Sequence, residues 1–294
     1  MIRHALLLLV LVSACRTETA PPGRPVQDDL GRTVAVPARI TRIVSLAPSV
    51  TELIYAAGAG SKLVAVTDAD NFPPEVTGLE RIQALPVNRE AVVVLRPQLV
   101  LASEQVNDPR DADALATLGI PTWFVVVDSL GDVTRAIRAL GMLLGTEPAA
   151  NRTADSLDAL HAALLAAPEP PSRPGVLLLV GDRSLFSFGG QSYAHDLVRL
   201  AGGRSVTADL TTKAPVLSDE FVLDAAPDVI VGAFGTEYDP ARLLENHPTW
   251  SAVPAVRNRA VHSIDPDLIL RPGPRLFSGV LAIRDALRAP TPSP

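Results

Sequence analysis

The alternation of short apolar segments with helical segments is the feature that most constrains the fold of this 294-residue chain. Residues 42–46 and 63–66 are segments of strand length rich in apolar residues, and the segment between them has the apolar spacing of a helix. Within that segment, Ser49 followed by Glu52 predicts a capping box at the helix start. Strands separated by helices pair in parallel, because a parallel connection needs a crossover. The sequence therefore predicts an α/β fold.

The alternation occurs twice, in the two halves of the chain. Each half holds a short helix that begins at a polar cap, Asn88 or Ser218, and is followed by a proline and a strand. The offset that separates these caps also separates Glu90 from Glu220. So long a period is typical of a duplicated lobe and not of a solenoid. Chance similarity between two α/β segments is the alternative.

Two further segments organise the chain. Residues 27–36 predict a hairpin that turns near Gly31. Residues 131–173 lie between the halves and are helical in pattern, and the second helix within them starts at Pro148 and runs to about residue 167. Such a helix is roughly 30 Å long at 1.5 Å per residue. We expect it to be a stiff connector between two lobes, the alternative being a helix packed on one lobe alone.

The N-terminus predicts export. Arg3 and His4 precede an apolar run over 5–12, which is much shorter than the about 20 residues of a membrane-spanning helix. Residues 12–15 resemble the lipobox of bacterial lipoproteins, which implies cleavage before Cys15 and lipidation of its sulfur. The alternative is a plain signal peptide. Cys15 is the only cysteine, so the exported chain forms no intramolecular disulfide. We expect it in the periplasm or at the cell surface, anchored through Cys15.

Composition supports a globular chain in this compartment. Hydrophobic residues make up 47%, enough for a real core, and the net charge of −6 is spread without the basic patch that binds nucleic acid. The predicted organisation is a signal peptide with lipobox at 1–15, a polar tether at 16–25, an N-terminal lobe at 26–130, a helical connector at 131–173, a C-terminal lobe at 174–288 and a tail at 289–294.

Few residues suggest catalysis. The histidines lack metal-ligand spacing, and no dinucleotide-binding glycine motif follows a strand. Residues 190–194 approximate a nucleophile elbow around Ser192, with Asp228 or Asp239 and then His262 downstream in the order of a hydrolase triad. Ser192 is more simply the N-cap of the helix that follows. We expect no enzyme activity, metal or cofactor, and a secreted serine hydrolase using Ser192 is the alternative.

Four segments together carry a family resemblance: 42–53, 89–100, 218–230 and 271–276. They resemble the substrate-binding proteins of bacterial ABC importers for iron-siderophores, haem and vitamin B12, and the resemblance extends over about 27–286. It implies two Rossmann-like α/β lobes joined by one long rigid helix, with the ligand in a cleft between them. It also implies that the protein, a monomer, delivers a metal-chelate nutrient to a membrane permease that works with a cytoplasmic ATPase.

The resemblance assigns roles to particular residues. Glu90 and Glu220 match two acids, one on each lobe, that dock onto arginines of the permease. Each lies in the first turn of a short helix, where the helix dipole also favours a carboxylate. Four residues match positions that contact the ligand: Phe72, Phe186, Asp267 and Arg271.

The vitamin B12-binding branch is the closest in the resemblance, so cobalamin is the favoured ligand. Where close relatives in that branch carry tryptophans, this chain has Ala84 and Ala214, and where haem binders place a ligating tyrosine it has Gln83. Siderophore binders offer a cluster of arginines, for which only Arg271 and Lys213 are candidates here. Siderophores and haem remain alternatives as ligands, and a lipid-anchored adhesion or scaffold protein is an alternative of another class.

Overall fold

The computed structural model describes residues 23–168 and 170–289. The predicted signal peptide, Cys15, residues 16–22 of the tether and residues 290–294 of the tail lie outside the described residues. Arg24 and Pro25, expected in the tether, belong instead to the first strand of a hairpin, which turns at Gly31 with a φ of 76°. The hairpin pairs β1 (Arg24–Gln27) with β2 (Thr33–Val36) in antiparallel register.

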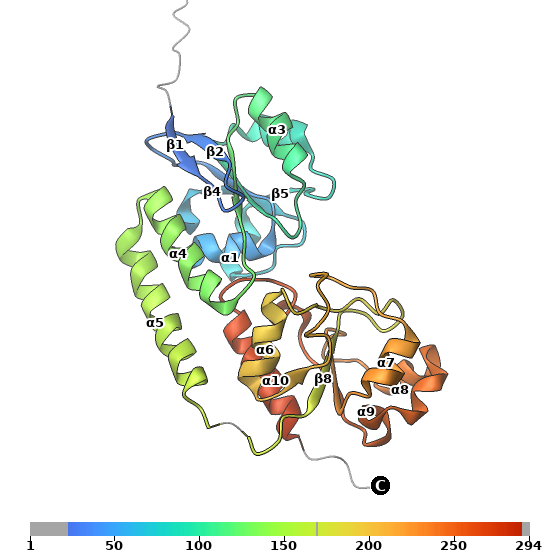
Figure 1. Ribbon diagram of the computed structural model, residues 1–294. Helices are drawn as coiled ribbons and strands as arrows, with labels where there is room; N and C mark the ends of the chain where they lie inside the picture. Colours follow the sequence, from blue (N-terminus) through green and yellow to red (C-terminus); the bar gives the residue numbers. More distant parts are fainter. Residues whose placement is uncertain (1–22, 169, 290–294) are drawn as a thin grey trace, which may run out of the picture.

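The first half of the chain forms an N-terminal lobe around a five-stranded parallel sheet (Figure 1). Its strand order is β5-β4-β3-β6-β7. The strands are β3 (Ile43–Ser45), β4 (Leu63–Thr67), β5 (Glu80–Ile82), β6 (Leu99–Ser103) and β7 (Thr122–Val125). The helices are α1 (Pro48–Ala56), α2 (Arg89–Leu95), α3 (Pro109–Thr117) and α4 (Leu130–Leu144), with the short 3₁₀ helices η1 (Gly60–Lys62) and η2 (Pro74–Gly78).

The second half forms a C-terminal lobe around a four-stranded parallel sheet of order β11-β10-β8-β9. The strands are β8 (Gly175–Leu179), β9 (Arg204–Ser205), β10 (Val229–Gly232) and β11 (Val261–Ser263). The helices are α6 (Tyr193–Ala201), α7 (Asp219–Ala225), α8 (Ala241–Asn246), α9 (Pro254–Arg257) and α10 (Leu276–Arg288), with the 3₁₀ helices η3 (Pro248–Ala252) and η4 (Pro266–Leu268). The α/β fold with two lobes is therefore confirmed.

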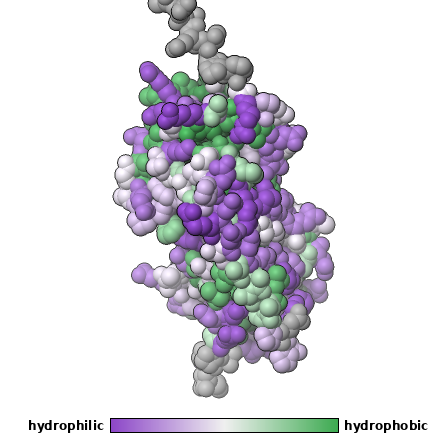
Figure 2. All heavy atoms as spheres, turned by 90° about the vertical axis from the view of Figure 1, so that its left-hand side faces the viewer, coloured by the Kyte–Doolittle hydropathy of each residue, from purple (hydrophilic) through white to green (hydrophobic). Residues whose placement is uncertain are grey.

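One helix, α5 (Glu147–Leu165), runs along the side of both lobes (Figure 1). It packs against α4 and α1 of the N-terminal lobe and against α10 of the C-terminal lobe, so it is not confined to one of them. Figure 2 views the molecule from this side and shows hydrophilic side chains across its middle, with apolar ones gathered in one area on each lobe. The outer face of the connection is thus polar and faces solvent.

The apolar core is continuous from one lobe to the other. The inner faces of α1 and α4 share one buried cluster with α6, α10 and strand β8. Ile137 of α4, Leu197 of α6 and Phe277 of α10 are all within 2% of complete burial in that cluster. Separate apolar clusters fill the other face of each sheet. Because burial of apolar area is the main favourable term in folding, this shared cluster couples the two lobes mechanically.

The duplicated helices match in detail. Asn88 accepts a hydrogen bond from the Ala91 amide at the start of α2, and Ser218 accepts one from the Phe221 amide at the start of α7. Both helices end on a non-glycine residue in the left-handed region, Arg96 with φ 47° and Ala226 with φ 42°. A shared departure from common backbone geometry at the same offset supports duplication over chance similarity.

Two predicted caps differ from the structure. The capping box at Ser49 and Glu52 is wrong, because α1 begins two residues earlier, with Ala47 at the N-cap and no side-chain cap. Glu52 turns instead toward the C-terminal lobe. Ser192 does lie at the N-cap of α6, but its hydroxyl donates to the Gly189 carbonyl at 2.8 Å and caps no amide.

The packing of α4 against α5 generates the first prediction. A Cβ at Gly141 would lie 2.4 Å from the Ala150 Cβ, whereas a Cβ at Gly131 would meet only the Ser129 hydroxyl oxygen at 3.7 Å. We predict that Gly141→Ala destabilises the chain by about 1–3 kcal/mol through overpacking, despite the better helix propensity of alanine. Gly131→Ala, the matched control on the same helix, gains up to about 1 kcal/mol. Urea unfolding measures both, and equal signs would contradict the close approach of the two helices.

Candidate ligand-binding site between the lobes

The carboxyl ends of the strands of both sheets point toward each other. The loop after β4 hydrogen-bonds to the segment after β11, since Asn71 donates to Asp267 at 2.8 Å and Arg271 donates to the Ala69 carbonyl at 3.0 Å. The loop after β7 pairs with the segment after β9, through Asp128 and Lys213 at 2.7 Å. In open parallel sheets, ligands bind outside the carboxyl ends of the strands. We call the loops at these ends, on both lobes, the interlobe site.

A network of charged side chains joins the lobes at one edge of the interlobe site. Glu52 of α1 accepts two hydrogen bonds from the Arg275 guanidinium, at 2.6 and 3.0 Å, and its side chain is 1% exposed. Arg271 pairs with Asp267 at 2.9 Å and lies 4.0 Å from Glu52. Burial raises the pKa of Glu52, against the lowering effect of the Arg275 hydrogen bonds and of both arginine charges. A buried carboxylate of this kind is tolerated only because it is paired.

The same network positions an aromatic ring. The Arg275 guanidinium lies over the ring of Phe72, 4.7 Å from its centroid, in the geometry of a cation–π contact. Phe72 is still 41% exposed, so its other surface is open. The ring is therefore held by a side chain of the opposite lobe and remains available for contact.

A second polar contact, between Lys213 and Asp128, joins the two lobes elsewhere in the interlobe site. Lys213 bonds to both carboxylate oxygens of Asp128, at 2.7 and 2.8 Å, and lies 3.7 Å from Glu104. Burial works against the charge of Lys213, but its hydrogen bonds to Asp128 raise its pKa, so it stays protonated. Lys213 is thus engaged in an ion pair between the lobes.

Exposed apolar side chains lie in the loops at the carboxyl ends of the strands on both lobes. Each follows the carboxyl end of a strand: Phe72 after β4, Leu85 after β5, Val106 after β6, Phe186 after β8 and Val216 after β9. Leu85 and Val216 are more than 60% exposed, and Phe186 and Val216 form an isolated β-bridge that sets them side by side. Exposed apolar side chains of this kind, on the loops after the strands of both lobes, are what a small-molecule site needs for apolar contact.

The structure brings the four residues expected to contact ligand to these loops. Phe72 and Phe186 lie on opposite lobes and are both more than 40% exposed. Asp267 and Arg271 lie on the segment after β11 and are 19% and 15% exposed, because their polar atoms bond to each other and to the N-terminal lobe. Sequence reasoning missed Leu85, Val106 and Val216. Only Val106 follows a strand that the sequence predicts, so no pattern marked the other two.

The two acids expected to dock onto a permease are exposed at the starts of α2 and α7. Hydrogen bonds from its own backbone and from the Ser218 hydroxyl lower the pKa of Glu220. Its neighbour Asp219 is engaged elsewhere, with His247 at 2.7 Å and Trp250 at 2.9 Å. In Figure 1, α7 and α3, the neighbour of α2, lie on the side of their lobes away from α5.

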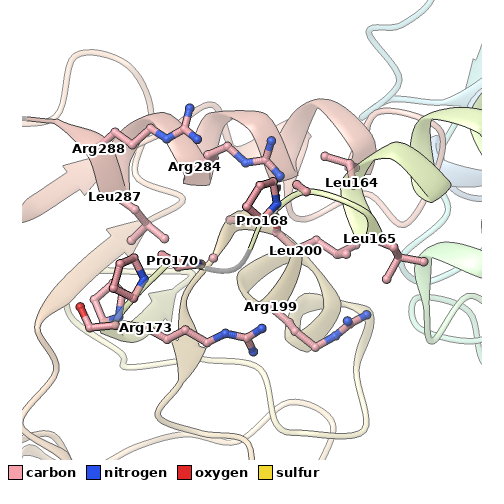
Figure 3. A pocket seen from close by; sticks show the side chains of 16 residues that line it. Leu164, Leu165, Pro168, Pro170, Arg173, Arg199, Leu200, Arg284, Leu287 and Arg288 are labelled. Atoms are coloured by element: carbon pink, nitrogen blue, oxygen red, sulfur yellow. Dashed lines mark hydrogen bonds between the residues drawn. The ribbon is translucent and has the colours of Figure 1, made fainter.

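A cavity of about 650 Å³ lies elsewhere, between the end of α5 and the far ends of α6 and α10 (Figure 3). It is separated from Arg275 by the length of α10, about 20 Å at 1.5 Å per residue. Two of its arginines bond within the protein, since Arg284 donates to the Leu200 carbonyl at 2.8 Å and Arg199 pairs with Asp196 at 3.1 Å. None of the residues expected to contact ligand lines this cavity.

Other kinds of site are not found among residues 23–168 and 170–289. No group of three or more metal-ligating side chains is close enough to hold an ion there. In the same part of the chain, no helix has the length and apolarity to cross a membrane.

Residues 43–268 match the protein family described as periplasmic binding protein. The ABC transporter substrate-binding lipoprotein YvrC of Bacillus subtilis is 30% identical over 281 residues, which covers 92% of this chain and 87% of that protein. Among solved structures, the vitamin B12-binding protein BtuF of Vibrio cholerae is similar with a TM-score of 0.73 and 27% identity, covering 85% of this chain and 97% of that one. The apo haem-binding protein RhuT from Roseiflexus sp. RS-1 has a TM-score of 0.72 and 28% identity, covering 84% and 97%.

The chain belongs to the periplasmic binding protein family. It is a solute-binding protein of ABC import and not an enzyme, and the hydrolase alternative at Ser192 is not supported. The buried hydroxyl of Ser192, committed to the Gly189 carbonyl, agrees with that conclusion.

The ion pair between Glu52 and Arg275 generates the second prediction. Removing one partner leaves a largely buried charge with only a more distant partner, Arg271 at 4.0 Å from Glu52 or Asp267 at 3.5 Å from Arg275. Glu52→Gln and Arg275→Met each therefore destabilise the chain, by about 3 kcal/mol. The double variant loses clearly less than the sum, because neither buried charge remains alone. Chemical unfolding of the four proteins measures the coupling. Strict additivity would show that the two side chains do not stabilise each other.

Proposed function

We propose that this protein captures a cobalamin in the interlobe site and delivers it to the membrane permease of an ABC importer. The observation that carries the proposal is the pairing of two features: exposed apolar side chains on both lobes, and charged side chains that already neutralise one another. A large ligand with apolar faces and little net charge fits such a surface better than a polyanion does. Vitamin B12-binding relatives of known structure support the same ligand.

Exposed aliphatic side chains next to Ala84 and Ala214 compensate for the tryptophans that close vitamin B12-binding relatives carry at those two positions. Ala84 is 8% exposed and turns into the lobe, whereas its neighbour Leu85 is 66% exposed. Val216, two residues beyond Ala214, is 62% exposed. We infer that Leu85 and Val216, together with Phe72 and Phe186, supply the apolar contact area for a corrin ring.

The other two ligand classes fit less well. A ferric catecholate carries net negative charge and needs uncompensated cations, but Arg271 and Lys213 are both in ion pairs. Haem iron needs an axial ligand. Tyr238 is the only tyrosine in the loops after the strands, and burial, with the charge of Asp182, raises its pKa to about 12, which opposes the phenolate form. Cobalamin carries its own metal ligands, so it needs neither uncompensated cations nor an axial ligand from the protein.

The third prediction tests the ligand contacts. Phe72→Ala and Phe186→Ala each weaken cobalamin binding by about tenfold or more, because a large aromatic contact area is lost. Arg271→Ala weakens it as well by releasing Asn71 and Asp267 at the edge of the site. The control is Leu281→Ala, which removes a partly exposed apolar side chain from α10. Isothermal titration calorimetry reports the affinities. Unchanged binding by all three variants would place the ligand elsewhere.

The fourth prediction separates delivery from capture. We propose that Glu90 and Glu220 meet cations on the permease, one from each lobe. Exposed charges at a rim act mainly on encounter rate and register, and their effect falls with salt. The double variant Glu90→Ala with Glu220→Ala keeps cobalamin affinity but forms a weak complex with the permease and supports little uptake. Uptake at the wild-type rate would show that the two acids do not dock onto the permease and only stabilise the starts of their helices.

The fifth prediction concerns the anchor. We propose that the mature chain begins at Cys15 and is held at the membrane by lipid on that residue. Each buried CH₂ of a lipid chain contributes about 0.8 kcal/mol, and stable attachment needs more than one chain. Cys15→Ser therefore moves the exported protein from the membrane fraction to the soluble fraction. Equal membrane association of both proteins on fractionation would contradict lipidation.

A further inference from the structure

A groove of about 560 Å³ lies between α2 and α3, directly beside Glu90. Its apolar lining comes from Val93 and Val94 of α2 and from Ala114 and Leu118 at α3. Val94 is 79% exposed and Leu118 is 56% exposed. Arg89, Glu90 and Thr117 complete the lining. Aliphatic side chains exposed to this extent and grouped in one groove are unusual on a surface that faces only water.

The groove follows the duplication in part. The offset that relates Glu90 to Glu220 also relates Val93 to Leu223, and these two aliphatic side chains are 40% and 37% exposed. Each lies three residues after its acid, hence on the same helix face. Both lobes thus present an acid with an exposed aliphatic neighbour one turn away.

The match between the two halves does not extend to the next position, so the two lobes differ there in chemical character. Val94 corresponds to Asp224, so the patch is apolar on α2 where it is acidic on α7. Within residues 23–168 and 170–289, Glu90 makes no ion pair or side-chain hydrogen bond, so its exposed carboxylate is open to a cation from outside. The N-terminal lobe therefore offers one acid beside an apolar groove, and the C-terminal lobe offers two acids around one aliphatic side chain.

We propose that the groove between α2 and α3 receives an apolar side chain of the permease, carried next to the cation that pairs with Glu90. The inference rests on the function proposed above and adds that the two lobes contact the permease in different ways. The contact of the N-terminal lobe is apolar and persists in high salt, whereas the contact of the C-terminal lobe is electrostatic. The occupant is argued from charge complementarity at Glu90 and from the apolar lining beside it.

The test measures binding of the full chain to its permease in nanodiscs, with empty nanodiscs as reference, at low and at high salt. The double variant Val94→Asn with Leu118→Asn binds about tenfold more weakly at both salt concentrations, a loss of about 1.4 kcal/mol. The control, Met142→Asn with Leu281→Asn, changes exposed apolar residues on α4 and α10 and binds within twofold of wild type. Glu220→Gln weakens binding at low salt only.

The outcomes separate the inference from the function on which it rests. If the wild-type chain does not bind the permease, the proposed function itself fails. If the wild-type chain binds and the Val94 and Leu118 variant binds equally well, the groove is not a contact and the inference is overturned, while the function stands. Thermal unfolding and cobalamin titration check that the variant is folded. A second pair, Val94→Ala with Leu118→Ala, repeats the measurement with residues that favour a helix.

Discussion

The buried carboxylate of Glu52 is the interaction on which the arrangement of the interlobe site depends. A carboxylate that is 1% exposed needs a partner, and its partner, Arg275, comes from the other lobe. By pairing with Glu52, Arg275 also comes to lie over Phe72, while Arg271 beside it bonds to the loop that carries that ring. One buried charge thus fixes the distance between the lobes and the orientation of the Phe72 ring. The desolvation of Glu52 is offset only when the lobes are in this register.

The rest of the connection between the lobes is consistent with a rigid pair. The ion pair of Lys213 with Asp128 lies at the other edge, and the apolar cluster shared by α1, α4, α6 and α10 runs behind both. Helix α5 contacts both lobes along its length. If the interlobe site binds the ligand as proposed, it is largely preformed, so less of the binding free energy is lost in ordering it. The exposed apolar side chains lie on the loops that this framework supports.

Much of the fold could be predicted from the sequence, because local patterns determine it. The caps Asn88 and Ser218, the paired acids and the connecting helix all rest on spacing within a few residues, and all are found where they were expected. The capping box at Ser49 was wrong because Glu52 meets a partner 223 residues away, which no local pattern reveals. Leu85, Val106 and Val216 were missed for a related reason. Their exposure depends on how the facing loops pack, whereas a single aliphatic residue after a strand is an ordinary feature of a sequence.

The central claim is that the two lobes hold a cobalamin between apolar side chains, and calorimetric titration over a range of temperatures tests it most directly. The account predicts binding of one cobalamin per chain with a negative heat-capacity change, the signature of apolar surface removed from water. Binding with no such change would contradict the apolar walls. A chain that binds a ferric siderophore or haem but no cobalamin would contradict the choice of ligand, and a chain that binds none of the three would contradict the proposed function.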